Sequence, residues 1–234
     1  MKKILVLIMV ILSCWQLSAQ FNPGRLKFGI LGGYAFYSQD DLKSLNQIIS
    51  DEIPFDTQII DDFEPVVYFV GYVQYELFNQ FYLGPAYEYH YTGSRLGARD
   101  YSGMFSFDQY VRTHQLGLKA DYSLFSMKSI FIAAELNLGA SFTDWEMDSK
   151  LEIGDNEEYS EQELEQLEGF SWYVSPTLKL GYQIFSWVSL TGRAAYSFDV
   201  NQDYHYQNNK NIDIIRNPDW NGLKLSAGLE FQLR

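Results

Sequence analysis

Alternation of apolar and polar residues recurs along this chain, and no other feature constrains its fold as strongly. The last stretch, GLKLSAGLEFQLR at residues 222–234, places an apolar side chain at every second position. A period of two residues is that of a β-strand whose two faces meet different environments. The pattern occurs seven more times, at residues 26–37, 65–78, 81–92, 104–122, 130–142, 170–183 and 188–198. The sequence therefore predicts an all-β protein of eight strands.

The connections between these stretches alternate in length. Long polar segments, at residues 39–63, 93–103, 143–169 and 199–219, follow the first, third, fifth and seventh stretches, and short ones follow the others. Such an order places long and short connections at opposite ends of one meander. Aromatic residues gather near both strand ends, as they do at the two interfaces of a bilayer. We therefore predict an eight-stranded antiparallel up-and-down transmembrane β-barrel, with a soluble β-barrel as the alternative.

The fourth stretch departs from the pattern in its first half. Arg112 falls on the apolar face there, while Phe107 and Val111 fall on the opposite face. An inserted residue that shifts the register would produce this change, so we expect a β-bulge near His114.

The N-terminus has the layout of a secretory signal peptide. Two lysines precede the apolar run from Ile4 to Leu12, and the small residues Ser18 and Ala19 follow. The run is too short to span a membrane as a helix. We expect cleavage after Ala19, giving a signal peptide at residues 1–19 and one barrel domain at residues 20–234. The only cysteine, Cys14, would be lost with the peptide, so the mature chain would hold no disulfide or thiolate metal site; the alternative is lipidation of Cys14, since ILSC loosely resembles a lipoprotein cleavage box.

The charge of the chain argues against nucleic acid as a partner. The formal net charge is -13, and loss of Lys2 and Lys3 makes it more negative still. An acidic protein repels the phosphate backbone.

We also expect the protein to be a monomer and to bind no cofactor.

With these features together, the chain resembles the small outer-membrane β-barrel proteins of Bacteroidota, often described as PorT-like, whose architecture is similar to OmpX and the OmpA barrel. The segments that carry the resemblance are RLKFGILGGYAFYS, VGYVQYELFNQFYLGPAYEYHY and GLKLSAGLEFQLR, and it covers residues 21–234. It implies an outer-membrane location, with lipid and lipopolysaccharide around the barrel. It also implies that the outer-membrane assembly machinery recognises the final strand, although Arg234 replaces the usual terminal aromatic residue.

If the apolar faces meet lipid, the opposite faces fill a narrow interior. Five basic and five acidic residues lie on those faces: Lys27, Lys119, Lys179, Arg193 and Lys224, with Glu76, Glu88, Asp121, Glu135 and Glu230. An unpaired buried charge costs several kcal/mol, so this balance predicts an interior network of ion pairs. We expect Lys27 to lie near Glu76, Glu135 near Lys179, and Arg193 within reach of Glu230.

The first and third long segments are acidic, and each has the pattern of a short helix. Leu42, Leu45, Ile48 and Ile49 recur at helical spacing in the first. In the third, Ser160 and Glu163 form a capping-box pattern and Gly169 would end the helix. An exposed stripe of Leu42, Leu45 and Ile49 would suit an unknown protein partner. Solvated loops and surface binding of divalent cations are the other possibilities.

Three functions remain open at this point. The first is a structural or interaction role for a barrel with a charged, plugged interior and acidic extracellular loops. The second is a narrow gated pore for small ions or solutes. The third is a lipid A-modifying enzyme, but His90, His114 and His205 stand in no familiar nucleophile pattern, so we expect no enzymatic activity.

Overall fold

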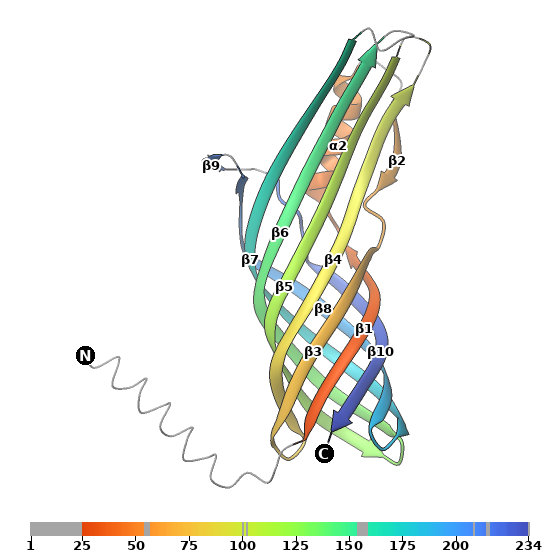
Figure 1. The fold of residues 1–234 in the computed structure, drawn as a ribbon, viewed down its shortest axis with the longest axis vertical. Helices are drawn as coiled ribbons and strands as arrows, with labels where there is room; N and C mark the ends of the chain where they lie inside the picture. Colours follow the sequence, from red (N-terminus) through yellow and green to blue (C-terminus); the bar gives the residue numbers. More distant parts are fainter. Residues whose placement is uncertain are drawn as a thin grey trace, which may run out of the picture.

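The computed structural model describes residues 25–53, 57–99, 101, 103–153, 159–207, 209–213 and 216–233. Eight antiparallel strands form a closed ring (Figure 1). They are β1 (Leu26–Tyr37), β3 (Val66–Phe78), β4 (Phe81–Arg99), β5 (Gly103–Met127), β6 (Ile130–Ile153), β7 (Tyr159–Phe185), β8 (Val188–Tyr206) and β10 (Gly222–Leu233). Two short strands, β2 (Gln58–Asp62) and β9 (Asn209–Asp213), and the helix α2 (Asp40–Glu52) are added to this ring. The predicted eight-stranded barrel is confirmed, while the signal peptide and the cleavage site lie outside the described residues.

The first and last strands of the barrel form its seam. β10 pairs with β1 from Leu26 and Leu233 at one end to Tyr37 and Gly222 at the other. β10 also pairs with β8 through its opposite edge. The pairing leaves neither β1 nor β10 with a free edge along these residues, so the seam closes the ring.

Tight turns join β3 to β4, β5 to β6 and β7 to β8 at one end of the barrel, which we call the turn end. Near this end and in the middle of the barrel, the outward side chains are large, apolar and exposed. On β6 they include Ile130, Leu136, Leu138 and Phe142. The inward side chains of the same strand include the buried Glu135 and Asn137.

Strands β4 to β7 continue well beyond the upper ends of β1, β3 and β10 (Figure 1). Along this extension the outward side chains become polar and the inward side chains become apolar, the reverse of the arrangement nearer the turn end. On β6 the outward residues become Asp144 and Glu146, and the inward residues become the buried Trp145 and Met147. The extension therefore has an apolar interior, which is continuous with barrel residues such as Tyr68 and Tyr72, and a polar outer surface.

This exchange also explains the irregular fourth stretch. The pairing of β5 with β4 and β6 is continuous through His114, and the only register shift lies near the turn end, between Ser123 and Phe125. The predicted bulge near His114 is wrong. Val111 is buried and Arg112 is exposed because the strand there has entered the extension, where apolar residues point inward.

The third long segment is mostly strand. Residues 143–153 of β6 pair with residues 159–169 of β7, so that Ser149 faces Glu163 and Glu152 faces Ser160. The helix predicted from the capping-box pattern is therefore wrong. The ladder satisfies the backbone groups of both segments, and Gly169, the expected helix stop, lies under the Tyr204 ring, whose Cε1 would be 2.1 Å from an added Cβ.

The first long segment contains the helix that the sequence predicted, but its apolar stripe is not exposed. α2 lies behind β4 to β6 in Figure 1. Leu42 is fully buried, and Leu45 and Ile49 pack against the same apolar core. The prediction of an exposed stripe for a protein partner is wrong, because the inward side chains of the extension provide an apolar surface that this face of the helix covers. Within the described ranges, no helix has the length and apolar composition needed to cross a bilayer.

Two prolines lie within strands of the closed ring, and each interrupts one ladder. The pairing of β3 with β4 skips the positions around Pro85, and the pairing of β7 with β8 skips those around Pro176. The register is the same on both sides of each interruption. Each missing N–H is therefore accommodated by a local gap rather than by a bulge.

Candidate functional site

Seven charged side chains from six strands meet in the barrel interior, and we call them the central charge cluster. They are Lys27 of β1, Lys119 and Asp121 of β5, Glu135 of β6, Lys179 of β7, Arg193 of β8 and Glu230 of β10. All seven are buried because each occupies an inward position of its strand. The cluster holds four cations and three carboxylates.

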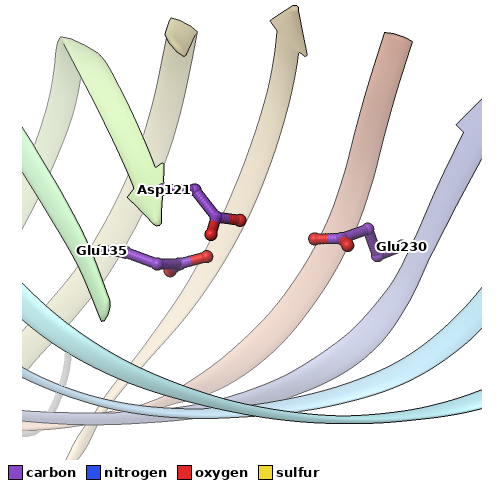
Figure 2. Close-up of side chains that lie close together, drawn as sticks. All are labelled: Asp121, Glu135 and Glu230. Atoms are coloured by element: carbon purple, nitrogen blue, oxygen red, sulfur yellow. The ribbon is translucent and has the colours of Figure 1, made fainter. Parts of the chain in front are cut away.

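Lys179 lies at the centre of this cluster. Its ammonium contacts Asp121 Oδ2 and lies 3.1 Å from Glu135 Oε1 and 3.0 Å from Glu230 Oε2. Figure 2 shows the three carboxylates, with Asp121 and Glu135 on one side and Glu230 reaching toward them from the other. An ammonium group has three hydrogens to donate, which matches three acceptors.

These carboxylates are also the residues that could hold a metal ion. Among the described residues they form a group whose oxygens lie within 4.8 Å of one another. Lys179 already supplies a cation to all three, however, and Lys27, Lys119 and Arg193 surround them. A divalent ion would enter an environment whose cations already outnumber its carboxylates. The arrangement is suited to neutralising charge within the protein.

The remaining contacts extend the cluster across the interior. Lys119 Nζ lies 2.6 Å and Arg193 Nε 3.1 Å from Glu135 Oε2. Arg193 Nη2 lies 3.9 Å from Glu230 Oε2, and the Tyr72 hydroxyl donates to that oxygen at 2.6 Å. The cluster therefore ties together strands that are not neighbours in the ring.

Lys27 has different partners from the one that the sequence suggested. Its ammonium lies 3.8 Å from Asp121 and 3.7 Å from Glu230, and it stands 3.5 Å from the centre of the Tyr82 ring. Glu76 lies closer to the turn end, where its carboxylate accepts from the backbone N–H groups of Arg25 and Gln80, each at 3.4 Å. The expected pair of Lys27 and Glu76 is wrong, because Lys27 stands opposite Gln74 in the register.

A second, smaller group surrounds Glu88 farther from the turn end. Lys224 Nζ lies 2.8 Å from Glu88 Oε2, and Asn137 Nδ2 donates to Glu88 Oε1 at 3.0 Å. His90 Nε2 lies 3.4 Å from the same carboxylate, and the His90 ring stacks on Tyr68. His90 is fully buried. The Tyr37 hydroxyl lies 3.2 Å from His90 Nδ1, so this group is an interior polar network of charged, amide and aromatic side chains.

The apolar core of the extension lies above these two groups. Its members include Leu42 of α2, Val111, Trp145 and Trp220. Trp220 Nε1 donates to Thr143 Oγ1 at 3.1 Å, and the Trp220 ring meets Tyr37 edge to face. We call α2 together with Trp220 the lid, since they lie against this core between the barrel interior and the solvent.

A buried hydrogen-bonded chain fixes α2 in the lid, and sequence reasoning missed it. Asn46 Oδ1 accepts from Gln109 Nε2 at 2.7 Å, and Gln109 Oε1 accepts from Trp145 Nε1 at 3.1 Å. Asn46 Nδ2 also donates to Asp62 Oδ1 at 3.3 Å. Asn46 lies four residues after Leu42, on the same helix face. A polar residue within an apolar stripe was therefore the available signal.

Comparisons with solved structures returned outer-membrane proteins of low sequence identity. A major outer membrane protein from Thermus thermophilus is 12% identical over 89% of this chain and 99% of its own, with a TM-score of 0.48. Neisserial surface protein A (NspA) is 11% identical over 90% and 97%, with a TM-score of 0.41. Ail, the attachment invasion locus protein of Yersinia pestis, is 12% identical over 90% and 100%, with a TM-score of 0.38. No protein-family model and no curated protein matches the chain.

Proposed function

We propose that this chain is an outer-membrane β-barrel with a sealed interior, and that its role is structural or interactive. In this proposal residues 1–19 direct secretion and are removed, and the mature chain resides in the outer membrane as a monomer of the small PorT-like kind. The extension and the lid lie outside the cell, and the turn end faces the periplasm.

The observation that carries the proposal is the belt of exposed apolar side chains around the barrel. On β6 the belt runs from Ile130 to Phe142, and outward carboxylates begin at Asp144. At the strand rise and tilt usual in such barrels, these twelve steps span about 30 Å, close to the thickness of the bilayer core. Aromatic residues bound the belt, with Tyr182 and Phe185 near the turn end and Trp172 near the extension. In water, so large an apolar surface would drive aggregation.

The filled interior supports a sealed barrel rather than a pore. The central charge cluster crosses the middle of the barrel with contacts among β1, β5, β6, β7, β8 and β10. The lid and its apolar core lie above it. Eight strands enclose little more space than their own side chains occupy. Ions would have to displace both layers in order to pass.

The proposed partners follow from the surface. The apolar belt faces membrane lipid, and lipopolysaccharide surrounds its outer rim. β10, which carries Phe231 stacked on Phe28 at 4.8 Å, is the segment that the assembly machinery would recognise. The acidic outer face of β6 and β7 is the surface available to a protein partner, whose identity the chain does not specify.

Three measurements on cells expressing the full chain test this proposal. The protein should fractionate with the outer membrane, and it should migrate faster on a gel before boiling than after it, as closed barrels do. The N-terminal peptide of the purified protein, identified by mass spectrometry, should begin at Gln20, free or cyclised to pyroglutamate. Recovery in the soluble periplasmic fraction, with identical migration before and after boiling, would refute the proposal.

A further inference from the structure

A groove of about 510 Å³ lies on the extension where β2, β4 and β5 meet. Arg95, Gly97 and Arg99 alternate along β4 with the buried Ser94 and Leu96 and with Ala98, which packs against the core. The three residues therefore lie on the outer face of the strand. The groove opens on that face, away from the lid and the central charge cluster. Its volume falls in the range of roughly 300–1,000 Å³ that small-ligand sites occupy.

The strand register builds this groove from the sequence. Gly97 stands opposite Ser106, and this small pair lies between two larger pairs, Arg95 with Asp108 and Arg99 with Met104. Ile60 of β2 leans over the floor, with its Cδ1 3.4 Å from the position that a Cβ on Gly97 would occupy. The result is a shallow floor with walls on three sides.

Hydrogen bonds hold one arginine–carboxylate pair in position beside the floor. Arg95 donates from Nε to Asp108 Oδ1 at 2.6 Å and from Nη2 to Asp108 Oδ2 at 2.9 Å. This bidentate pairing orients the guanidinium, and the Tyr110 side chain also hydrogen-bonds it. Arg99 lies exposed at the other end of the floor. The two arginines and Asp108 give the lining of the groove one net positive charge, while Asp61 of β2 stands opposite Arg95 and Asp148 of β6 opposite Asp108.

We propose that this groove binds an anionic saccharide, meaning a sugar that carries sulfate, phosphate or carboxylate groups. The ring lies over Gly97 and Ser106 with its C–H face against Ile60 and Met104. Arg99 binds the anionic substituents, together with those N–H groups of Arg95 that Asp108 and Tyr110 do not use, since guanidinium groups pair well with planar or tetrahedral oxyanions. Gln58 and the Ser106 hydroxyl are placed to bond sugar hydroxyls.

The height of the groove suits such a ligand, and this step rests on the proposed function. Arg95 lies four residues beyond Tyr91, the last exposed aromatic residue of β4. Four residues of a tilted strand rise about 10 Å above the belt. That is the level of the saccharides of outer-leaflet lipids, while a free anionic glycan could reach the groove from solution.

The test uses the refolded chain in detergent micelles. Calorimetric titration with a trisulfated disaccharide should show one site, and the unsulfated disaccharide should bind at least about tenfold more weakly. Titration with purified lipopolysaccharide in a second arm separates a membrane-bound ligand from a free one. The disaccharide titration needs no membrane, so it can show binding even if the protein does not reside in the outer membrane.

Matched variants decide whether binding occurs in the groove. Arg99→Gln should weaken binding at least about tenfold, whereas Arg112→Gln, an identical charge change on the outer face below the groove, should leave it unchanged. Gly97→Val should also abolish binding by filling the floor. Equal losses in the two arginine variants would show non-specific charge attraction and overturn the site. Binding that survives Gly97→Val, or no binding in either arm, would overturn it as well.

Discussion

The ammonium of Lys179 lies 3.0 Å from the carboxylate of Glu230, and this contact joins β7 to β10 across the barrel interior. The two residues are not cross-strand neighbours, because β8 lies between their strands. The same ammonium lies 3.1 Å from Glu135. One side chain therefore holds together strands from both sides of the ring.

Replacing Lys179 with methionine should destabilise the barrel by about 3–5 kcal/mol, because it leaves three carboxylates without their shared cation. Urea unfolding of the refolded protein in micelles, followed by tryptophan fluorescence, measures this change. Lys150→Met removes a half-exposed lysine that pairs with Glu152 and should cost less than about 1 kcal/mol. Similar losses in both variants would show that the central charge cluster has no special role in stability.

The lid depends on the burial of one helix face, and a pair of variants in α2 tests it. Leu42→Asp introduces a carboxylate into the apolar core, so α2 should detach and its amides should exchange with solvent much faster. Gln47→Asp adds a carboxylate on the exposed face, where it loses the hydrogen bond to Asp51 and repels that residue, so it should cost only about 0.5 kcal/mol and raise exchange far less. Protection of α2 that persists in Leu42→Asp would contradict the packing of the helix against the extension.

Two glycines in neighbouring strands should respond differently to the same substitution. A Cβ on Gly169 would lie 2.1 Å from the Tyr204 ring, whereas nothing lies within 4 Å of one on Gly192. Gly169→Val should therefore destabilise the protein by about 1–3 kcal/mol. Gly192→Val should be neutral or stabilising, since valine favours strands and points outward. The midpoints of urea unfolding give the comparison, and an equal effect of the two substitutions would be evidence against the strand pairing of the extension.

Partial burial raises the pKa of Glu165 near the tip of β7, and the neighbouring Glu163 raises it further. A raised pKa means that the folded state binds the proton more tightly than the unfolded state does. Protonation of Glu165 therefore stabilises the folded state. This stabilisation is lost as the pH rises through the raised pKa. Glu165→Gln should protect the amides of the tip against exchange at pH 7, with a smaller gain at pH 4.5. A gain that is independent of pH would contradict this origin.

The sequence predicted the barrel more fully than the extension, for a physical reason. Between the aromatic belts, outward residues are apolar along β1, β6 and β10, so alternation alone shows the strands. In the extension Trp145 and Met147 point inward, while Asp144 and Glu146 point outward. The alternation continues there, but the apolar residues now point inward and the polar residues outward. The many acidic residues also give this part of the sequence the composition of a solvated loop.

The charged residues of the interior could be predicted, but several of their partners could not. Alternation places Lys27, Asp121 and Glu230 on inward faces without structural information. Lys27 reaches Asp121 across the interior, between strands β1 and β5 that are not adjacent. The height of each inward residue along the barrel axis depends on how far neighbouring strands are shifted relative to one another. The sequence does not show this shift directly.

Conductance across a planar lipid bilayer tests the central claim, a membrane-spanning barrel with a sealed interior, most directly. Insertion of the refolded protein is first established by protection of its membrane-embedded strands against added protease. The inserted wild-type protein should then give no discrete channels, because the central charge cluster and the lid both close the interior. Discrete wild-type channels whose conductance or selectivity changes in Glu135→Gln would contradict this account and show that ions pass through the central charge cluster.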